Sequence, residues 1–153
     1  MAIPTSIVIP VLNEEKNINK IVNSISYYLK KFEYEIIFVD DDSDDNSKET
    51  LIRNSNKYKN LSFFIRKNCK RDLSQSCMLG FKKSKFKNIL VMDGDLQHNP
   101  KYLPKMIEIF NKKNLDFLVA SRNFQSAKNE GLSLMRFYAS KLIISIFFIL
   151  VGK

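Results

Sequence analysis

The stretch SIVIPVLNEEKNI, residues 6–18, sets the structural pattern of the whole chain. It opens with the β-branched run SIVIP, which is typical of a short buried strand. Asn13 can cap a following helix, and Glu14 and Glu15 place acidic charge in its first turn. A buried strand that leads directly into a helix is the repeating unit of α/β folds.

The same alternation continues outward from this stretch as far as residue 120. Apolar residues from Ile18 to Leu29 recur at helical spacing. A turn at 43–47 leads to a helix that ends at about Tyr58. The remaining predicted elements are strands at 35–39, 61–65, 88–92 and 117–120 and helices at 73–83 and 100–111. This order predicts an α/β fold, with a mostly parallel, Rossmann-like sheet flanked by helices on both faces.

After residue 130 the pattern changes. Residues 142–151, LIISIFFILV, form an almost unbroken apolar run between Lys141 and Lys153. The run is shorter than the roughly 20 residues that span a bilayer. A buried helix of the domain, an interfacial helix among lipid headgroups and the start of a spanning segment are all open interpretations. We expect one domain at 1–130 and an apolar or amphipathic helix at 131–153, whose abrupt end looks like a truncation.

Composition limits the partners more than the fold. A chain of 153 residues with 44% apolar residues can bury one core. Its formal net charge of +9 fits nucleic acid, an anionic membrane or a phosphorylated substrate. Cys69 and Cys77 have neither zinc-site nor redox-pair spacing, so we expect reduced thiols in a cytosolic protein, with Cys77 in the core. No basic-then-apolar leader precedes Ile3, so we expect no signal peptide.

Polar residues gather at the carboxyl ends of all five predicted strands. In chain order these are Asn13 and Glu14, Asp40 and Asp41, Arg66, Asp93 and Asp95, and finally Ser121 and Arg122. Open parallel sheets bind their ligands in the crevice outside these ends. The sequence therefore predicts the functional site at this edge of the sheet.

Asp93-Gly94-Asp95 is the most specific of these clusters. Two carboxylates separated by one small residue offer hard oxygen ligands that suit Mg²⁺ or Mn²⁺ held together with substrate phosphates. Gly94 would let the backbone approach a ligand closely. Asp40 and Asp41 can accept hydrogen bonds from a base or ribose, although a charged helix N-terminus is the alternative interpretation.

Guanidinium groups are candidate phosphate clamps because they bind phosphate oxygens in a bidentate way. The candidates are Arg66, Arg71, Arg122 and Arg136. Arg122 and Arg136 are favoured, because the first directly follows a predicted strand and the second lies on the next helix. His98, the only histidine, is interpreted as a loop residue and not as a catalytic base.

Five segments together resemble the family 2 glycosyltransferases with the GT-A fold, with the strongest resemblance to the dolichol-phosphate (polyprenol-phosphate) mannose synthase branch. The segments are SIVIPVLNEEKNI (6–18), FVDDDSDDNS (38–47), RDLSQSCMLGF (71–81), VMDGDLQHNP (91–100) and ASR (120–122). They occur in the family's order and cover essentially the whole chain. Gly94 stands where the family usually has Ala, and Asn99 interrupts its usual His-Pro-Pro.

The resemblance implies a role for each matching residue. The donor site would comprise Pro10, Asn13, Glu14, Asp40, Asp41, Arg71, Asp72, Leu73, Ser74, Asp93 and Gly94. The metal site would comprise Asp93, Asp95 and Gln97, and the acceptor phosphate would be held by Arg122, Arg136 and Ser140. Asp93, Asp95 and Arg122 would be the catalytic residues, with Mg²⁺ or Mn²⁺ as cofactor.

The predicted function is inverting transfer of a sugar, mannose from GDP-mannose, to a polyprenyl or dolichyl phosphate. The nucleotide-diphospho-sugar, the lipid phosphate and the membrane surface are the expected partners, and nucleic acid is not. We expect the cytoplasmic face of a membrane as the location, with residues 131–153 on the acceptor side. The family carries further C-terminal segments, so we also expect a missing segment or a membrane-anchoring subunit.

Other functions make different demands on the sequence. A UDP-sugar-dependent transferase, moving glucose or a modified arabinose to undecaprenyl phosphate, shares every motif. A nucleotidyltransferase would carry a Gly-rich basic loop after the first strand, where VLNEE is acidic. A glycosidase would need one raised carboxyl pKa, for which the Asp93–Asp95 pair gives no reason. A nucleic-acid-binding domain would need no such pair and would bind with a steep salt dependence.

Overall fold

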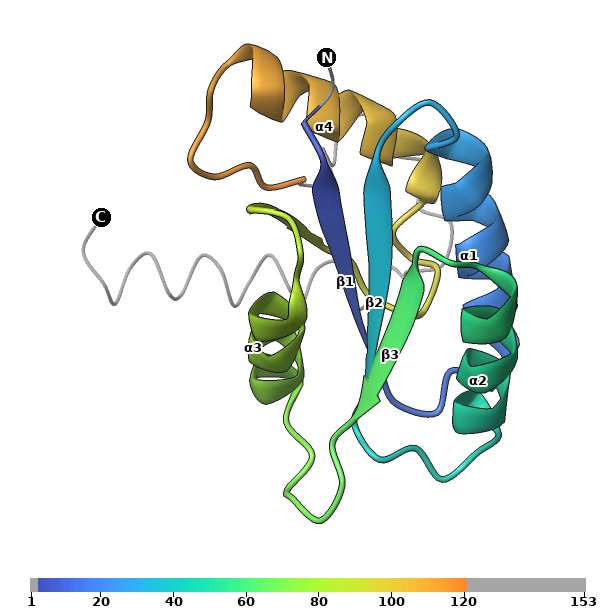
Figure 1. Cartoon of the computed structure of the whole chain (residues 1–153). Coiled ribbons are helices and arrows are strands. Elements are labelled where there is room, and N and C mark those ends of the chain that lie inside the picture. Colours follow the sequence, from blue (N-terminus) through green and yellow to red (C-terminus); the bar gives the residue numbers. More distant parts are fainter. Residues whose placement is uncertain (1–2, 121–153) are drawn as a thin grey trace, which may run out of the picture. The chain divides into compact units, whose positions relative to one another are not determined.

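The computed structural model describes residues 3–120 and contains a four-stranded, fully parallel sheet in the order β3-β2-β1-β4 (Figure 1). The strands are β1 (Thr5–Val11), β2 (Tyr34–Asp40), β3 (Leu61–Ile65) and β4 (Asn88–Val91). The helices are α1 (Glu15–Tyr28), α2 (Ser47–Lys57), α3 (Leu73–Lys83), the 3₁₀ turn η1 (Pro100–Tyr102) and α4 (Leu103–Lys112). Nearly all described residues belong to one compact unit, Met1–Leu118, of the two into which the chain divides.

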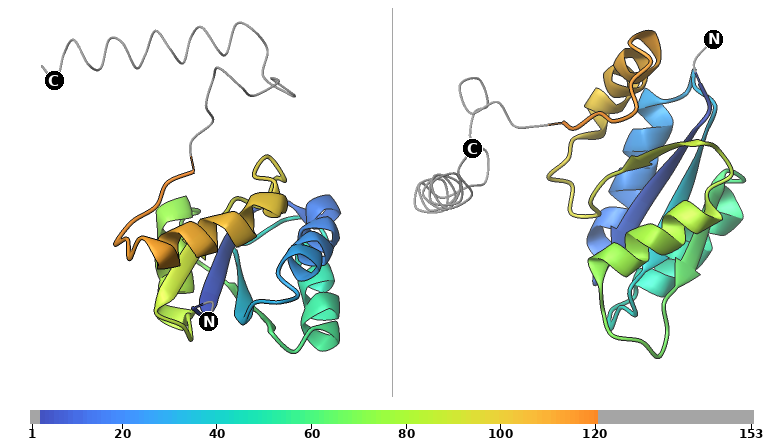
Figure 2. Two further views of the ribbon diagram at one scale, coloured as in Figure 1. Left: turned by 90° about the horizontal axis from the view of Figure 1, so that it is seen from above. Right: turned by 90° about the vertical axis from the view of Figure 1, so that its left-hand side faces the viewer.

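The predicted α/β architecture is confirmed. The predicted ranges 61–65 and 73–83 match β3 and α3 at both ends, and those of the other described elements agree to within one residue. Helices cover both faces of the sheet: α1 and α2 lie on one face and α3 on the other, as the view from above in Figure 2 shows.

Alternation along β1 divides the core between the two faces. Ile7, Ile9 and Val11 belong to a buried cluster that also contains the inward face of α1 and residues of α4. Val8 points the other way, toward α3, where the backbone of Gly80 packs so closely that a Cβ at this position would overlap the Val8 side chain. Side chains of a strand alternate between faces, so a strand that is buried along its whole length contributes to both layers.

Pro10 lies inside a central strand without disturbing the sheet. The backbone hydrogen-bonding groups of Val8 face β4, since the Val8 carbonyl accepts the amide of Met92 at 3.1 Å. Pro10 has the same orientation, but β4 pairs with β1 only as far as Val8. The missing N–H of the proline therefore falls beyond the end of β4, where no ladder bond is lost.

Two predictions are wrong: the strand at 117–120 and the core position of Cys77. Residues 117–120 form no strand, and Phe117 is 81% exposed. The chain turns after α4 through Asn114 in the left-handed region, and a four-residue apolar run becomes a strand only where it finds a pairing edge. Cys77 is only partly buried, because α3 turns Ser76 and Gly80 inward and places Cys77 beside this stripe.

The predicted terminal helix at 131–153, including its apolar run, lies outside the described residues. Within the described residues, no helix is long and apolar enough to cross a bilayer.

Candidate functional site

The carboxyl ends of β1, β2 and β3 lie at the lower edge of the sheet in Figure 1, and β4 runs parallel to β1. The strand order reverses between β1 and β4, and such a switch point leaves a crevice outside the strand ends. Gly94, after β4, lies directly against the end of β1: a Cβ on this residue would stand 2.7 Å from Val11 Cγ1 and 3.6 Å from Glu14 Cγ. The segments that follow β1 and β4 therefore meet at this point.

The loop after β1 is fastened to the loop after β2 by reciprocal hydrogen bonds. The amides of Asn13, Glu14 and Glu15 donate to side chains of the second loop, at 2.9 Å to Ser43 Oγ, 3.0 Å to Ser47 Oγ and 3.1 Å to Asp45 Oδ2. In return, Asn13 Oδ1 accepts the amide of Asp44 at 2.7 Å. The amides of the N-cap residue Glu14 and of the first helical residue Glu15 are thus satisfied from the neighbouring loop, since the first amides of a helix have no partner within it.

The prediction that Asn13 caps α1 is therefore wrong. Glu14 is the N-cap residue, without a side-chain cap bond, and Asn13 adopts a φ of 60° that turns its side chain toward the second loop. Asn tolerates this conformation better than most residues because its short polar side chain bonds locally.

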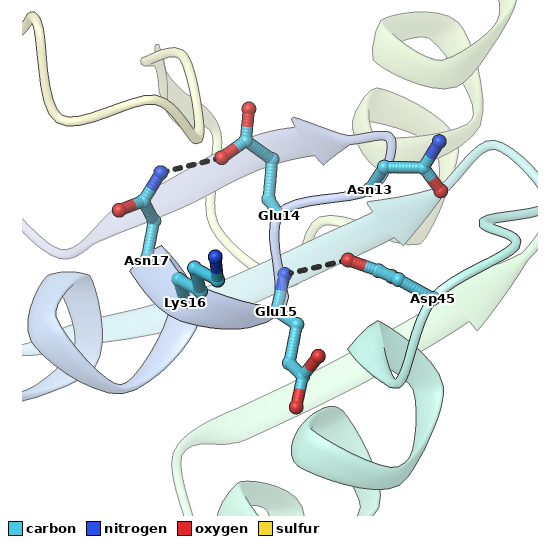
Figure 3. A pocket seen from close by; sticks show the side chains of 6 residues that line it. All are labelled: Asn13, Glu14, Glu15, Lys16, Asn17 and Asp45. Carbon is cyan, nitrogen blue, oxygen red and sulfur yellow. Dashed lines mark hydrogen bonds between the residues drawn. The ribbon is translucent and has the colours of Figure 1, made fainter.

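A cavity of about 320 Å³ lies beside this junction (Figure 3). Glu14, Lys16, Asn17 and Asp45 contribute to its lining, and Glu14 accepts a 2.6 Å hydrogen bond from the Asn17 side chain. Burial alone would raise the pKa of Asp45, but hydrogen bonds from Ser47 and from the Glu15 amide lower the pKa by more, so the carboxyl stays ionised. The cavity is lined by charged side chains of both signs.

Asp40 and Asp41, at the end of β2, are both nearly buried. Asp40 accepts the amide of Ser43 at 2.8 Å and thereby shapes the loop after β2. Asp41 forms an ion pair with Arg66, and its other oxygen accepts the amide of Asp72 at 2.6 Å. The interpretation of Arg66 as a phosphate clamp is wrong, because its side chain is only 10% exposed and its guanidinium bonds to groups of the protein.

Arg71 reaches from the segment before α3 to the loop after β2. Its Nη2 donates to Asp44 Oδ2 at 2.5 Å and to the carbonyl of Asp42 at 2.7 Å. The hydrogen bond with Asp44 raises the pKa of Arg71 above its ordinary value. Asp72 caps α3 by accepting the amide of Gln75 at 3.1 Å, and Ser74 is exposed on the first turn of this helix.

Asp93 and Asp95 project from a short loop after β4. The Asp93 side chain is 51% exposed, and its Oδ2 lies 3.6 Å from His98 Nδ1. Asp95 Oδ1 accepts the amide of Gln97 at 2.9 Å. Leu96 adopts a φ of 63°, which costs a residue other than Gly about 1–2 kcal/mol. Strained backbone of this kind concentrates at functional sites.

The donor set fits a divalent cation that is completed by substrate. The described residues contain no group of three His, Cys, Asp or Glu side chains arranged as a ready metal site. Mg²⁺ and Mn²⁺ commonly use only one or two protein carboxylates, with water and substrate phosphates as the remaining ligands. Asp93 and Asp95 would supply two carboxylates from a three-residue segment whose middle residue packs against β1.

The predicted donor residues within 3–120 all lie at or after the carboxyl ends of the four parallel strands: Pro10, Asn13, Glu14, Asp40, Asp41, Arg71, Asp72, Ser74, Asp93 and Gly94. Arg122, Arg136 and Ser140 lie outside the described residues. Sequence reasoning missed Ser43, Asp45 and Ser47 as the groups that hold the start of α1. The only signal was the density of short polar residues in SDDNS.

Comparisons with known proteins agree with this geometry. Residues 6–150 match glycosyl transferase family 2. A dolichol-phosphate mannosyltransferase of Pyrococcus furiosus is 36% identical over 89% of this chain, which spans only 38% of the length of that protein. The fold is shared by the structure of S. aureus TarS in complex with UDP-GlcNAc, with a TM-score of 0.64 and 19% identity over 82% of this chain and 39% of TarS. A mannosyltransferase of Pyrobaculum calidifontis with GDP-Man and Mn²⁺ also shares it, with a TM-score of 0.51 and 18% identity over 60% of this chain and 27% of that protein.

Proposed function

Because the chain belongs to glycosyl transferase family 2 and has the GT-A type of α/β fold, we propose that it binds a nucleotide-diphospho-sugar at the carboxyl edge of its sheet and transfers the sugar to a polyprenyl phosphate. One observation carries the proposal: the Asp93-Gly94-Asp95 loop packs against the end of β1 at the switch point, beside Glu14. The Asp93 carboxylate is accessible to an external ligand, since its side chain is half exposed.

The donor's base and ribose would lie against the loops after β1, β2 and β3. Asn13, Glu14, Asp41 and the start of α3 would form the polar wall on this side. The donor's diphosphate would lie toward Asp93 and Asp95. A divalent cation held by these carboxylates, with Gln97 as a further ligand, would offset the charge that develops on the departing diphosphate.

The reaction needs little proton transfer from the protein. An oxygen of the lipid phosphate attacks the anomeric carbon, the bond from this carbon to the diphosphate oxygen breaks, and the nucleoside diphosphate leaves with the electron pair. A phosphate monoester is already largely ionised at neutral pH. Orientation of two anions is the main demand on the protein. Arg122, Arg136 and Ser140 are proposed for the acceptor phosphate, and a single displacement inverts the anomeric centre.

Mannose from GDP-mannose is the proposed donor, supported by the Pyrococcus furiosus relative, whose name states a dolichol-phosphate mannosyltransferase. The UDP-GlcNAc held by the TarS structure supports a UDP-sugar as the second candidate. A polyprenyl phosphate acceptor implies work at a membrane surface, on its cytoplasmic side. The relative is much longer than this chain, so we also propose that further segments or an anchoring subunit complete the enzyme.

Binding and transfer can be tested in sequence. Calorimetric titration of the 153-residue chain with GDP-mannose and with UDP-sugars, each with and without Mn²⁺, should show Mn²⁺-dependent binding of one donor. Transfer of radiolabelled sugar to polyprenyl phosphate then tests the acceptor. Asp93→Asn should weaken metal-dependent donor binding about 100-fold, because the metal supplies several kcal/mol.

Asp116→Asn is the matched control, since this exposed aspartate lies in the turn after α4. A chain that binds no nucleotide-sugar with either Mn²⁺ or Mg²⁺ would contradict the proposed function. Donor binding without any lipid-linked product would contradict the acceptor alone.

A further inference from the structure

Arg66 differs from the other arginines that the structure describes in being almost fully enclosed. Its side chain is 10% exposed, whereas that of Arg71 is 42% exposed and Arg53 lies on the surface of α2. A buried guanidinium is stable only when its donors are satisfied and its charge is paired. Arg66 meets both conditions entirely within the protein.

The partners of Arg66 come from the end of β2 and from the segment that leads into α3. Its Nη1 contacts the carboxylate of Asp41, at the end of β2, and the carbonyl of Asp72, at the start of α3, at 2.9 Å. Its Nη2 donates to the carbonyl of Lys70 at 3.2 Å, and its backbone amide donates to the carbonyl of Asp40 at 2.8 Å. One side chain thus joins β2, the 66–72 segment and α3.

Asp41 completes the same junction from the other side. The oxygen that does not face Arg66 accepts the amide of Asp72 at 2.6 Å. Asp72 in turn caps α3, and its carbonyl accepts both the amide and the hydroxyl of Ser76. The ion pair and the hydrogen bonds of Asp72 therefore link the orientation of Asp41 to the first turn of α3.

We propose that Arg66 is a positioning residue for donor binding, which holds Asp41 and residues 70–72 as one rigid wall of the nucleotide pocket without itself touching the donor. The inference rests on the proposed function, because Asp41, Arg71 and Asp72 are donor-site residues only in that assignment. Without Arg66, the Asp41 carboxylate would be a buried charge without its cation, the Lys70 carbonyl would lose its guanidinium donor, and the Asp72 carbonyl would keep only the donors of Ser76. Donor binding would then have to order residues 70–72, and the free energy that this ordering costs would lower the affinity for the donor.

The test compares Arg66→Gln and Arg66→Lys with Arg53→Gln. Arg53 is the matched control because it makes one hydrogen bond, to Thr50 Oγ1 at 2.8 Å, away from the strand ends. Each variant is titrated with GDP and with UDP in the presence of Mn²⁺, and amide hydrogen exchange is followed over residues 67–76. Circular dichroism melting identifies the temperature range in which every variant is folded.

Arg66→Gln should weaken nucleotide binding about tenfold or more, because a small displacement of positioning groups is costly. It should also speed exchange of the Asp72 and Ser76 amides in the absence of nucleotide, whereas Arg53→Gln should leave both readouts unchanged. Arg66→Lys keeps the charge beside Asp41 but cannot reach both carbonyls, so it should fall between Arg66→Gln and the parent chain.

Two outcomes separate the inference from the proposed function. If the parent chain binds nucleotide and Arg66→Gln binds it equally well while folded, the positioning role is wrong and the function stands. If the parent chain binds neither GDP nor UDP, the donor site itself is wrong. Should Arg66→Gln not fold, Arg66→Lys decides: parent-like affinity with parent-like exchange over 67–76 would overturn the inference.

Discussion

The two sides of the candidate site are built on opposite principles. On the side of β2 and α3, the Asp41 carboxylate is buried, paired with Arg66 and bonded to the Asp72 amide. On the side of β4, the Asp93 carboxylate is half exposed, and the described residues offer it only His98, at 3.6 Å, as an ion-pair partner. The first carboxylate is satisfied within the protein, and the second keeps capacity for a ligand.

This difference separates structural from ligand-binding roles among aspartates that look equivalent in the sequence. A carboxylate that already has a buried cation and an amide donor can shape a wall, but it has little left to offer a metal. An exposed carboxylate contributes little to folding and keeps its oxygen ligands available. The comparison therefore predicts that mutations on the two sides act on different measurements.

Removing the two carboxylates should separate stability from ligand binding. Asp41→Ala leaves Arg66 buried and unpaired, so the free energy of unfolding should fall by about 3–5 kcal/mol. Asp93→Ala, at an exposed position, should change the free energy of unfolding by less than about 0.5 kcal/mol. Urea unfolding followed by circular dichroism measures both. Equal losses for the two variants would show that the β4 side is also held by its carboxylate.

Gly94→Ala should lower the free energy of unfolding by an amount between those of Asp93→Ala and Asp41→Ala. The new methyl group would stand 2.7 Å from Val11 Cγ1, so either the loop or β1 must shift. Overpacking of this kind costs about 1–3 kcal/mol. The double variant Gly94→Ala with Val11→Ala makes room for the methyl group, so a double-mutant cycle in urea unfolding should show favourable coupling. Additive losses would mean that the loop moves freely away from β1.

The smallest effect should appear at Cys77. Burial raises the pKa of the Cys77 thiol, and the negative charge of Asp93 raises the pKa further. Asp93→Asn removes the second cause, so the thiolate fraction and the alkylation rate of Cys77 at neutral pH should rise, by less than about tenfold for a screened charge. Iodoacetamide labelling followed by mass spectrometry measures the rate, with the exposed Cys69 as internal control. An unchanged Cys77 rate would show that the Asp93 charge is already neutralised locally.

The sheet and its helices could be predicted because each element carries its own local signal. The β-branched run of β1 and the apolar spacing of α1 indicate which side chains are buried. This pattern can be read from each segment alone, without knowing the rest of the fold. The run at 117–120 carried the same signal, yet a strand also needs a free edge at the right place. Strand pairing depends on the direction that the chain takes after Asn114, and the hydrophobic pattern does not predict this direction.

The location of the site could also be predicted, but not which of its residues face a ligand and which bond within the protein. Parallel strands bring their carboxyl ends to one edge, so the polar clusters had to meet there. Whether Arg66 faces a ligand or Asp41 depends on side-chain packing between β2 and α3, which spacing along the chain cannot report. For the same reason, Asn13 was expected to cap its own helix and instead bonds to the neighbouring loop.

The reciprocal bonds between the loops after β1 and β2 have a consequence for protein engineering. Neither loop carries a complete set of hydrogen-bond partners, because the amides of residues 13–15 end on Ser43, Ser47 and Asp45, and the amide of Asp44 ends on Asn13. A graft of residues 11–15 alone into another family member would bring donors without acceptors. The two loops are a single transplantable cassette, and chimeras designed to change donor preference should exchange residues 11–15 and 41–47 together.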